Sequence, residues 1–183
     1  MRCVSLDSAR EEPRTLRDAW PATGNLTIGA RALLAAVVMM IVVALDQSTK
    51  GLALVALSPD QPLEVSSFLN IAVGRNRGIS FGLLASDHPA APWLLSGLVL
   101  LVLVVLARWL RNDPRISVAA AFGAVAGGAV GNAVDRLRHG AVTDFLDFHA
   151  AGVHWPAFNV ADVAIVLGAG LYILTETADL RRR

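Results

Sequence analysis

The chain has little charge and almost no cysteine. Of its 183 residues, 17% are charged, 6% are aromatic and 55% are hydrophobic, and the formal net charge is only +1. Soluble domains carry about 25% charged residues, so this composition excludes an ordinary soluble domain. A near-neutral chain has no general basic field, which excludes nucleic acid as an expected partner. The single cysteine, Cys3, cannot form an intramolecular disulfide.

Residues for metal binding and for serine or cysteine catalysis are also scarce. The histidines show no ligand spacing with one another or with Cys3, and aspartates alone would give a hard cation little support. The histidines are His88, His139, His149 and His154. None of them lies in a helical segment that faces a candidate serine, so a nucleophile would lack a base. We therefore expect no metal and no cofactor.

Long apolar runs are what the sequence does contain, and four of them are close to the length of a membrane-spanning helix. They occupy residues 31–57, 93–110, 116–134 and 158–175. The start of the first run resembles a signal-peptide core, but apolar sequence resumes after Lys50, which favours a spanning helix. We predict an all-α membrane protein with four transmembrane helices.

The segment between the first two runs, residues 58–92, is long for a loop in such a protein. Its half-polar middle interleaves valine, isoleucine and phenylalanine with serine, asparagine and glycine, which predicts a small β-containing region outside the membrane. We expect this segment to cover a site. In the third apolar run, Gly123, Gly127 and Gly131 recur at every fourth position and predict a close helix contact.

The arginines predict the orientation of the chain. If both termini face one side, eleven arginines lie on that side and four on the other, with the only lysine, Lys50, inside a helix. The positive-inside rule then puts both termini in the cytoplasm. We expect a disordered polar tail at 1–30, a membrane domain at 31–175 and a short basic tail at 176–183.

Polar residues recur at one depth of this predicted bundle. Asp46 lies fifteen residues beyond Arg31, and Asn132 lies fifteen beyond Ser117, so each is about 22 Å from the cytoplasmic end at 1.5 Å per residue. In a hydrocarbon core of about 30 Å, both fall in the outer third. Asn159 enters the fourth run from outside and reaches the same level. Polar residues at this depth indicate a functional site near the outer face.

Helical spacing groups several of these residues on shared faces. Asn132, Asp135 and Arg136 have i, i+3, i+4 spacing, and Asp46 and Lys50 are four residues apart, so that they can pair. The alternative to a functional role is a structural ion pair of Asp46 or Asp135 with Lys50 or Arg136. The residues favour that alternative for these four charged side chains.

Asp144 and Asp162 differ because neither has a cation within a helical turn and both lie in apolar sequence. Asp162 follows Asn159 by three residues and shares its helix face. Two carboxylates that meet at low dielectric share a proton, which supplies one acid and one base. One carboxyl group can then activate water while the other protonates a carbonyl oxygen or a leaving amine.

An aspartyl peptidase could use this chemistry, and two other classes of protein remain open on these residues alone. A small transporter or proton-relay protein also carries acids and asparagines inside the membrane, although no polar trail continues here toward the cytoplasm. A noncatalytic scaffold with a structural polar layer is the other alternative. An Asp162→Asn variant separates a scaffold from a peptidase, because a scaffold keeps its function and a peptidase does not.

Five short motifs match a known family. They are DQSTK at 46–50, NRGISF at 76–81, GGAVGNAVDR at 127–136, VTDF at 142–145 and PAFNVAD at 156–162. In sequence and order they resemble signal peptidase II, the bacterial lipoprotein signal peptidase, over about residues 31–175. The resemblance implies an aspartic endopeptidase of the bacterial cytoplasmic (inner) membrane. Such an enzyme removes signal peptides from prolipoproteins and cuts before a cysteine that carries diacylglycerol.

The resemblance also implies roles for individual residues. Asp144 and Asp162 match the catalytic pair of the family. The residues that match the surroundings of its substrate pocket are Asn76, Gly78, Asn132, Arg136 and Asn159. The residues that match its supporting polar set are Asp46, Lys50 and Asp135.

Implied partners are prolipoprotein substrates, membrane lipids and globomycin-type cyclic peptide inhibitors. The chain departs from the family pattern at Arg77 and Ile79, where small residues are usual, and at Val163, where serine is common. These departures concern the detailed shape of the pocket and not the two aspartates.

Overall fold

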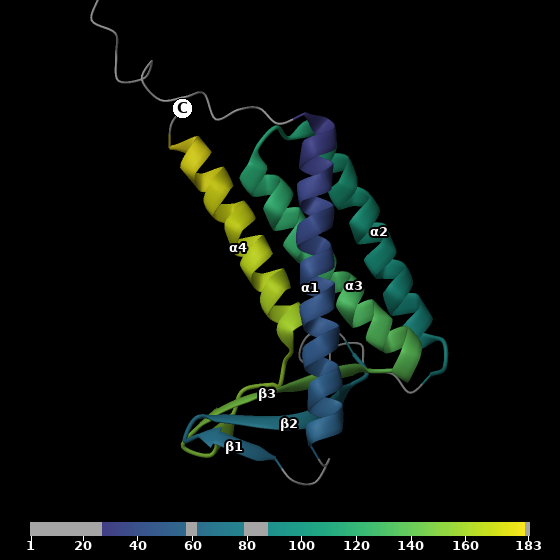
Figure 1. The fold of residues 1–183 in the computed structure, drawn as a ribbon, viewed down its shortest axis with the longest axis vertical. Coiled ribbons are helices and arrows are strands. Elements are labelled where there is room, and N and C mark those ends of the chain that lie inside the picture. Colours follow the sequence, from purple (N-terminus) through teal and green to yellow (C-terminus); the bar gives the residue numbers. More distant parts are fainter. Residues whose placement is uncertain (1–26, 58–61, 79–87, 182–183) are drawn as a thin grey trace, which may run out of the picture.

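The computed structural model describes residues 27–57, 62–78 and 88–181, and its largest part is a bundle of four helices (Figure 1). The helices are α1 (Ile28–Ala56), α2 (Ala91–Asn112), α3 (Ile116–His139) and α4 (Val160–Leu180). Each is long and apolar enough to cross a membrane. The expected four-helix membrane architecture is therefore confirmed. The residues outside these ranges are 1–26, 58–61, 79–87 and 182–183. They include most of the expected N-terminal tail, part of the expected cover with Ile79, and the end of the expected basic tail.

The third helix is longer than the sequence suggested. It continues past Val134 to His139 and ends at Gly140, which has φ 73°. Glycine adopts this left-handed conformation without steric cost. The end expected for this run at residue 134 is wrong, because residues 135–139 continue the helix. The charges of Asp135 and Arg136 are tolerated there because both side chains are buried in the protein.

The third helix, α3, also lies at the centre of the bundle, where it packs against α1, α2 and α4. A Cβ atom at Gly123 would lie 2.6 Å from the carbonyl oxygen of Ala35 on α1, and one at Gly131 would lie 2.5 Å from the Asp46 carboxylate. Gly127 faces α1 in the same way. The glycine spacing therefore lets α1 approach α3 closely, as predicted.

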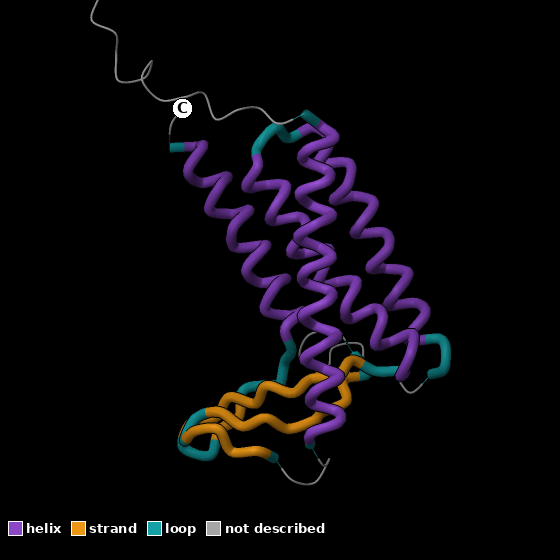
Figure 2. The backbone as a smooth tube through the Cα atoms, in the orientation of Figure 1, coloured by secondary structure: helices purple, strands orange, loops and turns teal. Residues whose placement is uncertain are grey.

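A four-stranded antiparallel sheet lies at one end of the bundle (Figure 2). Its strands, in spatial order, are β1 (Leu63–Ser66), β2 (Leu69–Asn76), β3 (Val142–Ala150) and β4 (Val153–His154). β2 pairs with β3 so that Asn76 faces Val142 and Gly74 faces Asp144. The expected strands between α1 and α2 are present. β3 and β4 were not predicted, because β3 depends on its pairing with β2, which is remote in the sequence, and the short β4 pairs only with β3.

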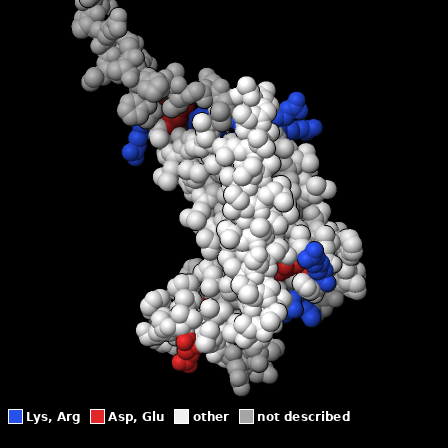
Figure 3. All heavy atoms as spheres, in the orientation of Figure 1, with Lys and Arg blue, Asp and Glu red and all other residues white. Residues whose placement is uncertain are grey.

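Charges gather toward the two ends of the molecule and leave a wide uncharged zone between them (Figure 3). Exposed leucine and valine side chains cover the helices in this zone, which suits contact with hydrocarbon. At the end away from the sheet, Arg115 binds Asp113 at 2.5 Å and also Glu176, so it ties the α2–α3 connection to α4. Its hydrogen bonds hold the pKa of Asp113 below the usual value.

Candidate active site

The two aspartates of the predicted pair come from different elements. Asp144 lies on β3, and Asp162 lies in the first turn of α4. Asn159, the residue that caps α4, contacts both. Its Nδ2 donates to Asp144 Oδ1 at 2.6 Å, and its Oδ1 accepts from the backbone N–H of Asp162 at 3.0 Å. The Asp162 carboxylate accepts in turn from the Asn159 backbone N–H at 3.3 Å, which completes a capping box.

Asp144 is only 4% exposed and accepts a hydrogen bond on each carboxylate oxygen. Asn159 binds Oδ1, and Nδ2 of Asn76, at the end of β2, donates to Oδ2 at 3.1 Å. Burial raises the pKa of Asp144 to about 6; the hydrogen bond from Asn76 opposes the rise, and the charge of Asp162 adds to it. A carboxyl group with this pKa can both hold and release a proton near neutral pH.

Asn132 on α3 binds Asp162 with a defined amide orientation. Its Nδ2 donates to Asp162 Oδ1 at 2.8 Å, while its Oδ1 accepts from Lys50 Nζ at 2.9 Å and from Asn159 Nδ2 at 3.2 Å. An ammonium group can only donate, so Lys50 must face the oxygen of Asn132. The NH₂ group of Asn132 is thereby directed at Asp162.

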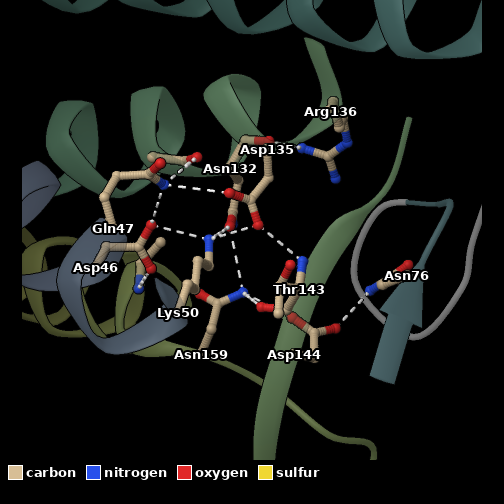
Figure 4. Close-up of polar contacts among 12 residues, drawn as sticks. Asp46, Gln47, Lys50, Asn76, Asn132, Asp135, Arg136, Thr143, Asp144 and Asn159 are labelled. Carbon is tan, nitrogen blue, oxygen red and sulfur yellow. Dashed lines mark hydrogen bonds and ion pairs between the residues drawn. The ribbon is translucent and has the colours of Figure 1, made fainter. Parts of the chain in front are cut away.

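A buried charge cluster adjoins this site (Figure 4). Lys50 Nζ lies 2.8 Å from Asp46 Oδ2 and 3.4 Å from Asp135 Oδ2, and the three residues are 2%, 0% and 1% exposed. The structural ion pairs that the sequence favoured are confirmed for these residues. Because the same cluster orients Asn132, ion pairing and support of the site are compatible roles.

Arg136 binds backbone groups where the sequence allowed an ion pair with Asp46 or Asp135. Its Nη2 donates to the carbonyl oxygen of Gly78 at 2.7 Å, and its Nη1 donates to that of Asn132 at 3.4 Å. No ion pair of Arg136 occurs among the described residues, so that part of the structural alternative is wrong. The helix directs this side chain toward the segment that follows β2, and Arg136 thereby connects α3 to Gly78.

A cavity of about 480 Å³ lies beside Asp162. Its polar wall consists of Asn76, Asn132, Arg136 and Asp162. The other lining residues are apolar side chains of α2, α3, β3, α4 and the segment before α4, with Trp155 among them. Val163, one of the departures from the family pattern, also lines the cavity. The cavity thus offers an apolar chamber with polar groups on one wall, which is typical of a ligand site.

Sequence reasoning missed two members of the site. Gln47 on α1 donates to Asp46 Oδ2 at 3.1 Å and to Asp135 Oδ1 at 3.2 Å. Thr143 on β3 is fully buried and donates its backbone N–H to Asp135 Oδ2 at 2.8 Å. Gln47 could have been found because it lies inside the DQSTK motif. Thr143 lies inside the VTDF motif, but its contact with Asp135 is made by the backbone N–H, which the identity of the side chain does not reveal.

The described residues contain no group of three or more histidine, cysteine, aspartate or glutamate side chains arranged to hold a metal ion. The functional groups described around the cavity and the charge cluster are carboxylates, amides, the ammonium group of Lys50 and the guanidinium group of Arg136. Two carboxylates held by amide donors beside a cavity can carry out general acid–base chemistry on a bound substrate.

Comparison with known proteins identifies the family. A family model described as signal peptidase (SPase) II matches residues 38–178. The chain belongs to the signal peptidase II family. The lipoprotein signal peptidase of Methylobacterium sp. (strain 4-46) is 43% identical over 140 residues, which are 75% of this chain and 85% of the relative. That of Cupriavidus necator (strain ATCC 17699) is 37% identical over 171 residues, which are 92% and 97% of the two chains.

A solved structure described as a bacterial membrane enzyme has the same fold. It matches with a TM-score of 0.73 at 28% identity, over 87% of this chain and 94% of that one. The resemblance inferred from the five motifs is therefore confirmed, and the chain is an aspartic peptidase of a bacterial multi-pass membrane family. The transporter or proton-relay alternative receives no support.

Proposed function

We propose that this protein removes signal peptides from prolipoproteins and cuts before a cysteine that carries diacylglycerol, with Asp144 and Asp162 as the catalytic pair. The observation that carries the proposal is the shared contact of both aspartates with Asn159, beside the cavity. Two carboxylates from separate elements meet where an apolar substrate can enter. Family membership supplies the class of reaction.

In the proposed reaction, one aspartate is ionised and the other carries a proton. The ionised carboxylate takes a proton from a water molecule, whose oxygen attacks the carbonyl carbon of the scissile peptide. The protonated carboxyl group gives its proton to the carbonyl oxygen, and the tetrahedral intermediate forms. Collapse of this intermediate breaks the C–N bond, and the leaving amine receives a proton from the pair. The raised pKa of Asp144 suits a proton shared between the two groups.

The surrounding polar residues position the pair and the substrate. Asn132 and Asn159 fix the carboxylates, and Asp46, Lys50 and Asp135 support these contacts from α1 and α3. Asn76, Gly78 and Arg136 lie toward the β2 side, where a substrate backbone would pass. Arg136 lines the cavity, and its guanidinium group, which can only donate, faces the space that a substrate carbonyl group would occupy.

The orientation and domain organisation complete the proposal. Both termini face the cytoplasm, and the site lies near the outer surface of the inner membrane, where the acyl chains of a lipidated cysteine sit. The membrane peptidase domain follows α1 and α4 to their ends, so its bounds are Ile28 and Leu180 where the sequence predicted 31 and 175. Membrane lipids surround the helices, and globomycin-type inhibitors compete for the same cavity.

The experiment compares one prolipoprotein with and without its diacylglyceryl group, incubated with the purified protein in lipid. We expect the lipidated form to be cut and mass spectrometry to place its lipid-modified cysteine at the new N-terminus. A globomycin-type inhibitor should block the reaction. Equal cleavage of both forms, or a cut elsewhere, would overturn the proposed substrate class, and no cleavage at all would overturn the proposed activity.

A further inference from the structure

Asp46 and Asp135, hereafter the inner pair, each bind the backbone one residue before a member of the proposed catalytic pair. Asp46 Oδ1 accepts from the N–H of Ala161 at 3.0 Å, and Ala161 precedes Asp162. Asp135 Oδ2 accepts from the N–H of Thr143 at 2.8 Å, and Thr143 precedes Asp144. The separation of the inner pair is therefore transmitted to Asp144 and Asp162 through one short hydrogen bond on each side.

Gln47 bridges the inner pair. Its Nε2 lies 3.1 Å from Asp46 Oδ2, 3.2 Å from Asp135 Oδ1 and 3.3 Å from the carbonyl oxygen of Gly131. All three partners are acceptors, so the NH₂ group of Gln47 points into the space between the two carboxylates. In Figure 4 the contacts of Gln47 and Lys50 converge on the same two aspartates.

Lys50 alone does not balance the inner pair, because one ammonium group faces two carboxylates. The formal charges of the three side chains sum to −1, and two buried carboxylates of like charge repel each other. The amide of Gln47 adds donors to both without adding charge. Removing it would leave each carboxylate with fewer donors in a buried site, where a missing donor is costly. The inner pair would then rotate or separate.

We propose that Gln47 is a positioning residue, which sets the separation of Asp144 and Asp162 through the inner pair. The inference rests on the proposed function, because it concerns the rate of that reaction. Gln47 does not line the cavity. Its substitution is therefore expected to lower kcat and to leave KM unchanged.

The test compares two substitutions of matched length, Gln47→Met and Gln47→Glu. The first removes the amide, and the second replaces the donor by an acceptor between the two carboxylates. Thr49→Val is the control on the same helix, since among the described residues the Thr49 hydroxyl donates to the backbone carbonyl oxygens of Leu45 and Asp46 and to no side chain. We expect kcat to fall about tenfold or more for Gln47→Met and further for Gln47→Glu, as for displaced catalytic groups, with KM within about twofold of the parent. The control should match the parent.

An exchange of partners separates positioning from general structural support. In the double variant Gln47→Glu/Asp135→Asn, the amide and the carboxylate change places across one contact. Asparagine at position 135 keeps an oxygen for the Thr143 N–H and offers its NH₂ group to the new glutamate. We expect the exchange to raise kcat about tenfold or more above that of Gln47→Glu. Each kcat is divided by the folded fraction, which is the share of protein that elutes as a monodisperse peak in size-exclusion chromatography.

The outcomes distinguish this inference from the proposed function. If the parent does not cleave prolipoprotein, the proposed function fails and the inference fails with it. If the parent cleaves and both Gln47 variants keep its kcat per folded molecule, the function stands and the inference is overturned, whatever happens to Tm. Should Gln47→Glu not fold, an exchange variant that regains folding together with activity supports the inference, and one that regains folding alone overturns it.

Discussion

Replacing Gly131 by alanine should damage the site without touching a proposed catalytic residue. The added Cβ would lie 2.5 Å from Asp46 Oδ2 and 3.1 Å from Asp46 Cγ. The Asp46 carboxylate cannot swing away freely, because it is fully buried and bound by Lys50, Gln47 and the N–H of Ala161. The clash is therefore relieved by moving the carboxylate together with the groups that it binds.

The size of the effect follows from these distances. An ordinary carbon–oxygen contact is about 3.3 Å, so the Asp46 oxygen must move by roughly 0.8 Å. Overpacking of this kind typically costs about 1–3 kcal/mol of stability, against a gain of up to about 1 kcal/mol from replacing glycine in a helix. A displacement near 1 Å in a site can lower the rate about 100-fold, and Asp46 passes its movement to Asp162 through Ala161.

The assay measures kcat/KM on lipidated prolipoprotein and thermal unfolding in detergent for the parent, Gly131→Ala and Gly51→Ala. Gly51 is the matched control on α1, because a Cβ there would meet nothing within 4 Å. We expect Gly131→Ala to lose about 100-fold in kcat/KM and to unfold at a lower temperature. Gly51→Ala should keep parental activity. A Gly131→Ala variant with at least a third of the parental kcat/KM would refute the reasoning.

Three further predictions concern charge. Lys50→Met leaves Asp46 and Asp135 buried without their cation and should cost about 3–5 kcal/mol of unfolding free energy, seen as loss of folded protein in detergent; near-parental Tm would contradict this. Because the pKa of Asp144 rises from 3.8 to about 6 on folding, the folded state binds more protons and the parent loses stability as pH rises from about 4 to 6. The Tm of Asp144→Asn should therefore rise above that of the parent at pH values above 6, and this difference should disappear below pH 4. A Tm difference that does not change with pH would contradict the raised pKa of Asp144. Arg115→Met should lower unfolding free energy by about 1 kcal/mol or less and leave cleavage unchanged, whereas a loss of kcat would link the far end of the bundle to the site.

The helices were predictable because hydrocarbon demands long apolar segments, and such segments are visible in any window of the sequence. The common level of Asp46, Asn132 and Asn159 along the bundle could be predicted too, since a helix rises by a constant amount per residue. Apolar sequence predicts the end of α3 too early, because it stops at residue 134 while the helix continues through Asp135 and Arg136 to His139. Buried partners make such charges compatible with a helix, and partners are a property of the fold.

The sheet part of the site was harder to predict. Asn76 reaches Asp144 because β2 pairs with β3, and this pairing joins segments on either side of two helices. Backbone contacts such as that between Asp135 and Thr143 do not depend on the identity of one side chain. Gln47 was recognisable as part of a motif, but its bridging contacts required the relative placement of α1 and α3.

The central claim is that Asp144 and Asp162 act as one catalytic unit. The most direct measurement is the single-turnover cleavage rate of lipidated prolipoprotein by Asp144→Asn, Asp162→Asn and the double variant. Asp147→Asn is the control, because Asp147 lies on the same strand and binds His154 instead of the site. Groups that act as a unit show strongly non-additive losses. We predict that each single variant loses nearly all activity, the double variant loses no more, and the control keeps the parental rate. A single variant with a near-parental rate, or losses that multiply in the double variant, would contradict the claim.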